Sequence, residues 1–102
     1  MTKRYVLFQV VCDSKLTDQQ FHDALDGSVR RYFGEVGFSR IDPKIVEYDT
    51  ESSTGIVSCE RGAASELESA MTLISKHSEK PLTVLVLRVS GTVKGVRRGV
   101  RR

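Results

Sequence analysis

The chain has 102 residues, a length typical of one domain with a single hydrophobic core. With 39% hydrophobic and 28% charged residues its composition is that of an ordinary globular protein, and no apolar run approaches the 18 or so residues that cross a membrane. The net charge is +3, and the two cysteines have no metal-type spacing and are too few for a secreted disulfide scaffold, so we expect a cytoplasmic protein with reduced cysteines.

The first two elements of the chain are predicted to be a buried strand and an amphipathic helix. Residues 5–11 are rich in β-branched and aromatic side chains, which favours a strand. Thr17 and Gln20 have the spacing of a capping box, which indicates that a helix begins at residue 18. Apolar and small residues then recur on one helical face as far as Phe33, and Gly34 is placed to end the helix.

The rest of the body predicts a hairpin, a second helix and a final strand. Residues 45–48 and 55–59 read as two strands joined by a polar turn, residues 63 to about 77 as a helix, and residues 82–87 as an apolar strand. The order β-α-β-β-α-β is that of the split βαβ, or ferredoxin-like and RRM-like, arrangement. We therefore expect a two-layer α/β (α+β) sandwich over residues 1–90, with both helices on one face of a four-stranded antiparallel sheet, followed by a basic C-terminal segment at 91–102.

The polar positions of the strands predict which way each strand faces. If Glu47 and Arg88 avoid the helix-covered face, alternation places the following residues in the core: Val6, Phe8, Val10, Val46, Tyr48, Val57, Cys59, Leu85 and Leu87. The opposite face would then carry Tyr5, Leu7, Ile45, Ile56, Val84 and Val86. So large an apolar surface indicates a contact site. We expect Tyr5, Leu7, Ile56, Val84 and Val86 to be covered either by a partner protein or by the chain's own C-terminal segment, and we favour a contribution from a partner.

Residues suited to catalysis are few, and we predict neither catalytic nor metal-binding residues. His22 has Asp18 and Asp26 at four-residue spacing, but a solvated helix face explains this better than a cation site. The chain has no catalytic triad signature and no glycine-rich phosphate loop. RNA-recognition motifs stack bases on aromatic side chains of the first and third strands, and residues 54–59 contain none. Binding of RNA would therefore depend on charge.

Basic residues are concentrated at the C-terminal end. Residues 1–87 carry 10 Lys and Arg against 13 Asp and Glu, whereas residues 88–102 carry 6 basic residues and no acid. Ser90, Gly91 and Thr92 can direct hydroxyl and backbone N–H groups at a phosphate as the chain leaves the sheet. A Gly-Val-Arg-Arg repeat follows, and arginine binds phosphate with two parallel hydrogen bonds. The predicted RNA-binding residues are Lys3, Arg4, Ser90, Gly91, Thr92, Lys94, Arg97, Arg98, Arg101 and Arg102.

Several stretches together resemble archaeal ribonuclease P protein component 2. They are residues 4–10, residues 55–61, residues 70–74 and residues 89–94, in the order and spacing of that family. The resemblance implies a subunit of the ribonucleoprotein that removes the 5′ leader from precursor tRNA. It further implies that the catalytic RNA and its Mg²⁺ carry the chemistry, that this chain binds no cofactor, and that component 3 and other protein subunits are its partners. Gly95 and Gly99 each weaken a terminal helix by about 1 kcal/mol relative to alanine.

Two other classes of protein stay open at this point. A general or ribosomal RNA-binding protein would share the basic C-terminal end. A ferredoxin-like domain that senses a small molecule would share the order of the elements, although the basic segment would then have no purpose.

Overall fold

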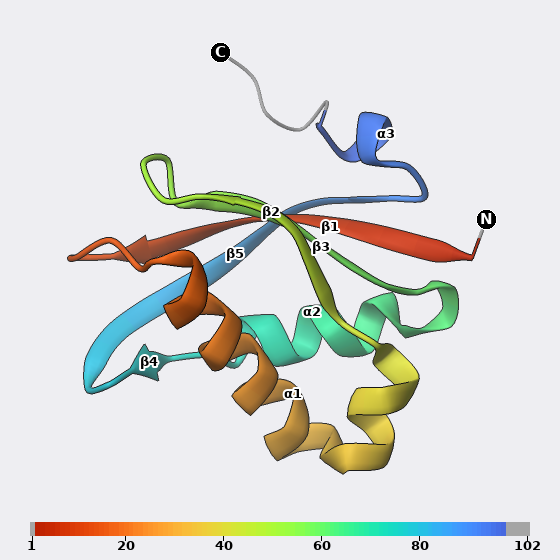
Figure 1. The fold of residues 1–102 in the computed structure, drawn as a ribbon, viewed down its shortest axis with the longest axis horizontal. Coiled ribbons are helices and arrows are strands. Elements are labelled where there is room, and N and C mark those ends of the chain that lie inside the picture. The colour runs from red at the N-terminus through yellow and green to blue at the C-terminus, as the bar shows by residue number, and fades with distance from the viewer. Residues whose placement is uncertain (1, 98–102) are drawn as a thin grey trace.

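The computed structural model describes residues 2–97, which form a sheet with helices on both faces (Figure 1). The elements in chain order are β1 (Lys3–Cys12), α1 (Asp18–Ile41), β2 (Lys44–Asp49), β3 (Thr54–Glu60), the 3-10 helix η1 (Arg61–Ala63), α2 (Ala64–Thr72), β4 (Lys76–His77), β5 (Lys80–Ser90) and α3 (Val93–Arg97). The strand order is β2-β3-β1-β5-β4, and every neighbouring pair is antiparallel. Because α1 and α2 share one face, the predicted sandwich is confirmed, with α3 added on the other face.

The fifth strand is the main difference from the predicted topology. The second helix ends at Thr72 rather than near residue 77, and β4 then pairs with the start of β5. Ser78 and Glu79 make the two-residue turn between them, with φ of 49° and 69°. Hairpins of this length usually have asparagine or glycine at these left-handed positions. Since this chain has serine and glutamate there, the turn chemistry gave no sign of the hairpin.

Helix α1 begins as predicted and ends later. The backbone N–H of Gln20 donates to Thr17 Oγ1 at 3.2 Å, and the backbone N–H of Thr17 donates to Gln20 Oε1 at 2.9 Å, so the capping box is confirmed. Gly34 interrupts the helix, with φ 72° and ψ −178°. Helical geometry then resumes as far as Ile41, and Asp42 caps the helix by donating its backbone N–H to Phe38 O at 2.8 Å. Gly34 therefore makes a kink where the sequence predicted a helix end.

Alanine at Gly34 is expected to destabilise the protein by about 1–3 kcal/mol, because almost only glycine adopts this combination of φ and ψ. A side chain there would meet no atom within 4 Å, so the cost is one of backbone strain. Gly27→Ala is the matched control: it lies in regular helix with open space around it and should stabilise by up to about 1 kcal/mol. Urea denaturation of both variants measures the difference, and equal stabilities would contradict the assignment of strain to Gly34.

The core between the sheet and α1 and α2 is built around stacked aromatic rings. Phe8 and Phe21 have ring centroids 4.5 Å apart, and Phe21 and Tyr48 have centroids 5.5 Å apart. The Tyr48 hydroxyl donates to Leu16 O at 3.0 Å, which satisfies its polar end. Aliphatic residues from every larger element of this layer complete the cluster, among them Val6, Val10, Leu25, Val29, Ile41, Val57, Leu67, Met71 and Val84.

The two cysteines are free, as predicted. The register of β1 on β3 places Cys59 opposite Arg4, whereas Cys12 lies at the other end of β1. Cys59 is fully buried, and this burial raises the pKa of its thiol to about 11. We therefore assign Cys59 a packing role in the core.

The predicted facing was wrong for most of β5 and part of β2, because each strand contains a bulge. Along β5, Arg88 pairs with Leu7 but Val86 pairs with Phe8, so Leu87 is an extra residue. A bulge of this kind reverses the inward and outward alternation of the strand. Val84 is therefore buried in the core and Val86 packs against it, whereas Leu85 and Leu87 are 43% and 44% exposed.

In β2 the extra residue is Val46. Ile45 pairs with Val57 and Glu47 pairs with Ile56, which leaves Val46 without an opposite residue. Ile45 and Tyr48 consequently both pack against the helix-covered core, and Val46 is 43% exposed. The predicted outward position of Ile45 and inward position of Val46 are thus corrected, while that of Tyr48 is confirmed.

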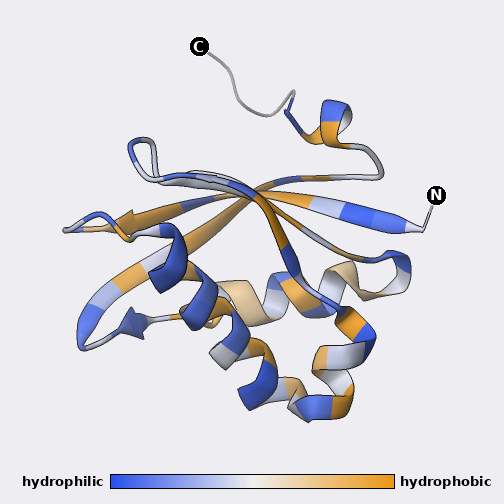
Figure 2. Cartoon of the chain, viewed as in Figure 1, coloured by the Kyte–Doolittle hydropathy of each residue, from blue (hydrophilic) through white to orange (hydrophobic). Residues whose placement is uncertain are grey.

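A second hydrophobic cluster lies on the opposite face of the sheet. Val96 of α3 is fully buried against Leu7 and Ile56, with Tyr5 and Val93 at its margin. Figure 2 shows that α3 combines hydrophobic and hydrophilic residues, as a short helix docked on a sheet requires. The chain's own C-terminal segment, one of the two expected covers, therefore shields part of this face.

Candidate nucleic-acid interface

The segment that leaves the sheet is organised by the hydroxyls of Ser90 and Thr92. The backbone N–H of Gly95 donates to Thr92 Oγ1 at 2.9 Å, and the backbone N–H of Thr92 donates to Ser90 Oγ at 3.3 Å. Thr92 thereby caps the start of α3 in the manner of a helix N-cap. Both hydroxyls, predicted to face RNA, are used within the protein to fix the direction of α3.

Gly95 allows α3 to approach this turn closely. A Cβ at this position would overlap Ser90 Oγ and would lie 2.8 Å from Thr92 Oγ1. The sequence indicated only that Gly95 weakens a helix. The structure adds that the glycine is what lets the helix pack against the two hydroxyls that cap it.

Two arginines attach α3 to the strands beneath it. Arg88 Nε of β5 donates to Gly95 O at 2.8 Å. Arg97 Nη2 donates to Glu47 Oε1 of β2, and the two side chains form an ion pair. Both residues were predicted to avoid the helix-covered face, and both do lie on the side of α3. Their contacts with α3 were not predicted from the sequence.

The predicted basic residues differ in how free they are to bind a phosphate. Lys3 forms ion pairs with Glu60 at 2.8 Å and Asp42 at 3.3 Å, and its hydrogen bond to Glu60 is the main reason why its pKa is raised. Arg4 Nη1 donates to Lys3 O at 3.3 Å, and its guanidinium lies beside Gly91.

Lys94 and Arg97 are both exposed, but their surroundings differ. Lys94 has no ion pair within residues 2–97, whereas Arg97 is paired with Glu47. The remaining predicted residues, Arg98, Arg101 and Arg102, lie outside the described residues. The structure therefore brings Arg4, Gly91 and Thr92 together where α3 begins, with Lys94 on the helix itself.

The predicted partner surface is smaller than expected. Leu7 and Ile56 are buried beneath α3, and Val84 belongs to the other face. Tyr5 and Val86 are partly buried. Large apolar side chains that do remain exposed on β1 and β5 are Val11, Leu85, Leu87 and Val89.

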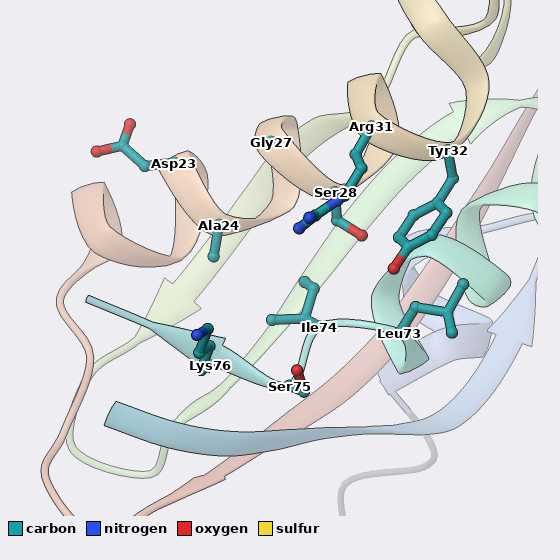
Figure 3. A pocket seen from close by; sticks show the side chains of 10 residues that line it. All are labelled: Asp23, Ala24, Gly27, Ser28, Arg31, Tyr32, Leu73, Ile74, Ser75 and Lys76. Atoms are coloured by element: carbon teal, nitrogen blue, oxygen red, sulfur yellow. The ribbon is translucent and has the colours of Figure 1, made fainter. Parts of the chain in front are cut away.

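A groove between α1 and the α2–β4 connection is another concave feature with charged walls (Figure 3). Arg31 reaches it from α1 and Lys76 from β4, with Ile74 between them. The buried hydroxyl of Ser28 donates to Ala70 O at 2.6 Å and so closes the groove on one side. Asp23 at one end partly offsets the two positive charges, and the lining residues include no histidine that could exchange protons near pH 7.

Among residues 2–97 no group of three histidine, cysteine or acidic side chains converges on a common point that could hold a metal ion. Nor does any helix in this range have the length and apolar character needed to cross a membrane. Polar contacts in the interface region are those of charged and hydroxyl groups with one another and with the backbone. Lys94, which is exposed, and the Arg4 guanidinium beside Gly91 are the cationic groups of this region that could bind an anion.

Fold and interface together define a small ferredoxin-like protein whose sheet is partly covered by its own basic C-terminal helix. Comparison with models of protein families matches residues 4–100 to the Rpp14/Pop5 family, and the chain belongs to this family. Ribonuclease P protein component 2 of Pyrococcus horikoshii is 32% identical over 93% of this chain and 79% of its own length. The protein of the same name from Methanocaldococcus jannaschii is 32% identical over 90% of this chain and 67% of its own.

A solved structure confirms the fold independently of the sequence. A chain in the cryo-EM structure of yeast ribonuclease MRP superimposes with a TM-score of 0.74. The match covers 89% of this chain and 75% of the other, at 14% sequence identity. At this identity the likeness speaks for the fold alone.

Proposed function

We propose that the chain is a non-catalytic protein subunit of ribonuclease P, the ribonucleoprotein that removes the 5′ leader from precursor tRNA. Membership of the Rpp14/Pop5 family over residues 4–100 is the observation that carries this proposal. The curated component 2 relatives support the same conclusion. They favour it over the two other classes of protein that the sequence left open.

The partners follow from the same proposal. We propose that the catalytic RNA binds the basic C-terminal segment, for which the exposed Lys94 and the side chains around the start of α3 give support. Component 3 and the other protein subunits would bind elsewhere on the chain, and precursor tRNA would be the substrate of the whole assembly. Mg²⁺ would act on the RNA rather than on this chain. A cytoplasmic location belongs to this proposal as well.

The purified chain alone is expected not to cleave precursor tRNA. Cleavage should require the catalytic RNA with Mg²⁺ and should be enhanced when this chain is present together with component 3. The measurement is release of the 5′ leader from labelled precursor tRNA in reconstituted mixtures, and the control omits only this chain. Metal-dependent cleavage by protein free of RNA would contradict a non-catalytic role, and an unchanged rate on omitting the chain would contradict its place in the enzyme.

A further inference from the structure

Glu47 is the one acidic side chain shown in contact with a predicted RNA-binding residue of the described part of the C-terminal segment. It belongs to β2, and it holds the guanidinium of Arg97 in an ion pair across 50 residues of sequence. The β2 bulge turns Glu47 toward the face that carries α3, because Glu47 pairs with the outward-facing Ile56. A phosphate that binds Nη2 of Arg97 therefore competes with this carboxylate.

The same ion pair is one of three contacts that keep α3 on the sheet. The others are the burial of Val96 against Leu7 and Ile56 and the hydrogen bond from Arg88 to Gly95. A helix of five residues is not stable by itself in water, so α3 depends on these contacts. Removing one of them weakens the docking of the whole helix.

We propose that Glu47 is an internal competitor of RNA: it occupies Arg97 until a phosphate replaces it, and the exchange releases α3 from the sheet. This inference rests on the proposed binding of RNA by the C-terminal segment. The exchange is physically reasonable because the Arg97 and Glu47 side chains are 56% and 47% exposed. Both charged groups remain largely hydrated in the ion pair, so separating them changes their hydration little. RNA additionally offers several phosphates and releases counterions when they are bound.

Affinity for RNA tests the competition directly. Glu47→Gln keeps the size of the side chain and removes its charge. We expect it to tighten binding to the catalytic RNA of an archaeal ribonuclease P by about two- to fivefold. An exposed ion pair contributes up to about 1 kcal/mol, and its removal from the competition corresponds to a change in affinity of this size. Glu51→Gln is the matched control, because Glu51 lies in the β2–β3 turn, has no ion pair within residues 2–97 and gives the same change in net charge.

The double variant separates competition from general electrostatics. In an Arg97→Gln background, Glu47→Gln should improve binding no more than Glu51→Gln does, because the competed side chain is gone. An equal gain with and without Arg97 would overturn the inference while leaving RNA binding intact. If Arg97→Gln itself has no effect on affinity in a protein that does bind RNA, Arg97 is not a contact and the inference falls. Absence of any binding would instead remove the proposed function on which it rests.

Release of α3 has its own measurement. The Val96 amide donates to Thr92 O at 3.0 Å, so its hydrogen exchange reports on the integrity of the helix. Exchange at Val96 should become faster in Glu47→Gln without RNA, and faster in the wild-type chain when the catalytic RNA is added. Unchanged or slower exchange in both cases would show that the helix stays docked and would overturn its release.

Discussion

Glutamine at all five basic positions beyond Thr92 is expected to weaken binding to the catalytic RNA by roughly two orders of magnitude. The positions are Lys94, Arg97, Arg98, Arg101 and Arg102. For each phosphate that the variant no longer binds, the slope of log K against log salt should also fall by about 0.9 for duplex or about 0.7 for single-stranded RNA. A salt titration of the variant and the wild-type chain against the same RNA measures both effects.

Substitution is preferable to truncation at this end of the chain. A deletion from Lys94 onward would also remove Val96, whose burial against Leu7 and Ile56 contributes to the outer hydrophobic cluster. The matched control exchanges three exposed cations of the body that have no ion pair within residues 2–97, namely Lys15, Arg31 and Lys80. If this control lowers the salt slope as much per charge as the C-terminal variant does, the RNA site belongs to the body instead.

Alanine at Gly55 should destabilise the fold by about 3 kcal/mol, the upper part of the range for an overpacked core. A Cβ there would lie 2.6 Å from the backbone oxygen of Glu47 and 2.8 Å from Phe8 Cζ. The first atom belongs to the paired strand β2 and the second to the stacked aromatic core, so neither can move without breaking other contacts. The expected fall in melting temperature is about 10–20 °C.

Gly62→Ala is the matched control for this experiment. It makes the same chemical change in η1, where a Cβ would meet no atom within 4 Å, and should leave stability unchanged or slightly higher. Thermal unfolding followed by circular dichroism compares the two variants. A Gly55→Ala protein as stable as the control would show that β2 and Phe8 are not packed as closely as described.

Prediction from sequence succeeded where a signal is local. The capping box of Thr17 and Gln20, the apolar strands and the order of the large elements all follow from short-range patterns, and each is confirmed. These patterns are therefore sufficient to assign the fold class. Gly34 was correctly identified as a break in the helix, but helical geometry resumes after it because nothing local forbids it.

Prediction failed where the outcome depends on pairing between distant strands. Val46 and Leu87 are extra residues only in the pairing of their strands with β3 and β1. No pattern within β2 or β5 alone therefore predicts them. Val84 and Ile45 were consequently assigned to the wrong face. Glu47 and Arg88 were correctly placed away from the helix-covered face, but their contacts with α3 were not predicted, because those contacts join segments far apart in the sequence.

The bulge at Leu87 has a consequence for how this protein can vary. The extra residue changes which alternate residues of β5 face the helix layer, so that Val84 and Val86 pack against that layer whereas Arg88 lies on the α3 side and donates to Gly95 O. Substitutions at Val84 or Val86 should disturb the packing of α2, whereas substitutions at Arg88 should disturb the attachment of α3. The helix layer and the C-terminal helix therefore depend on different positions of the same strand.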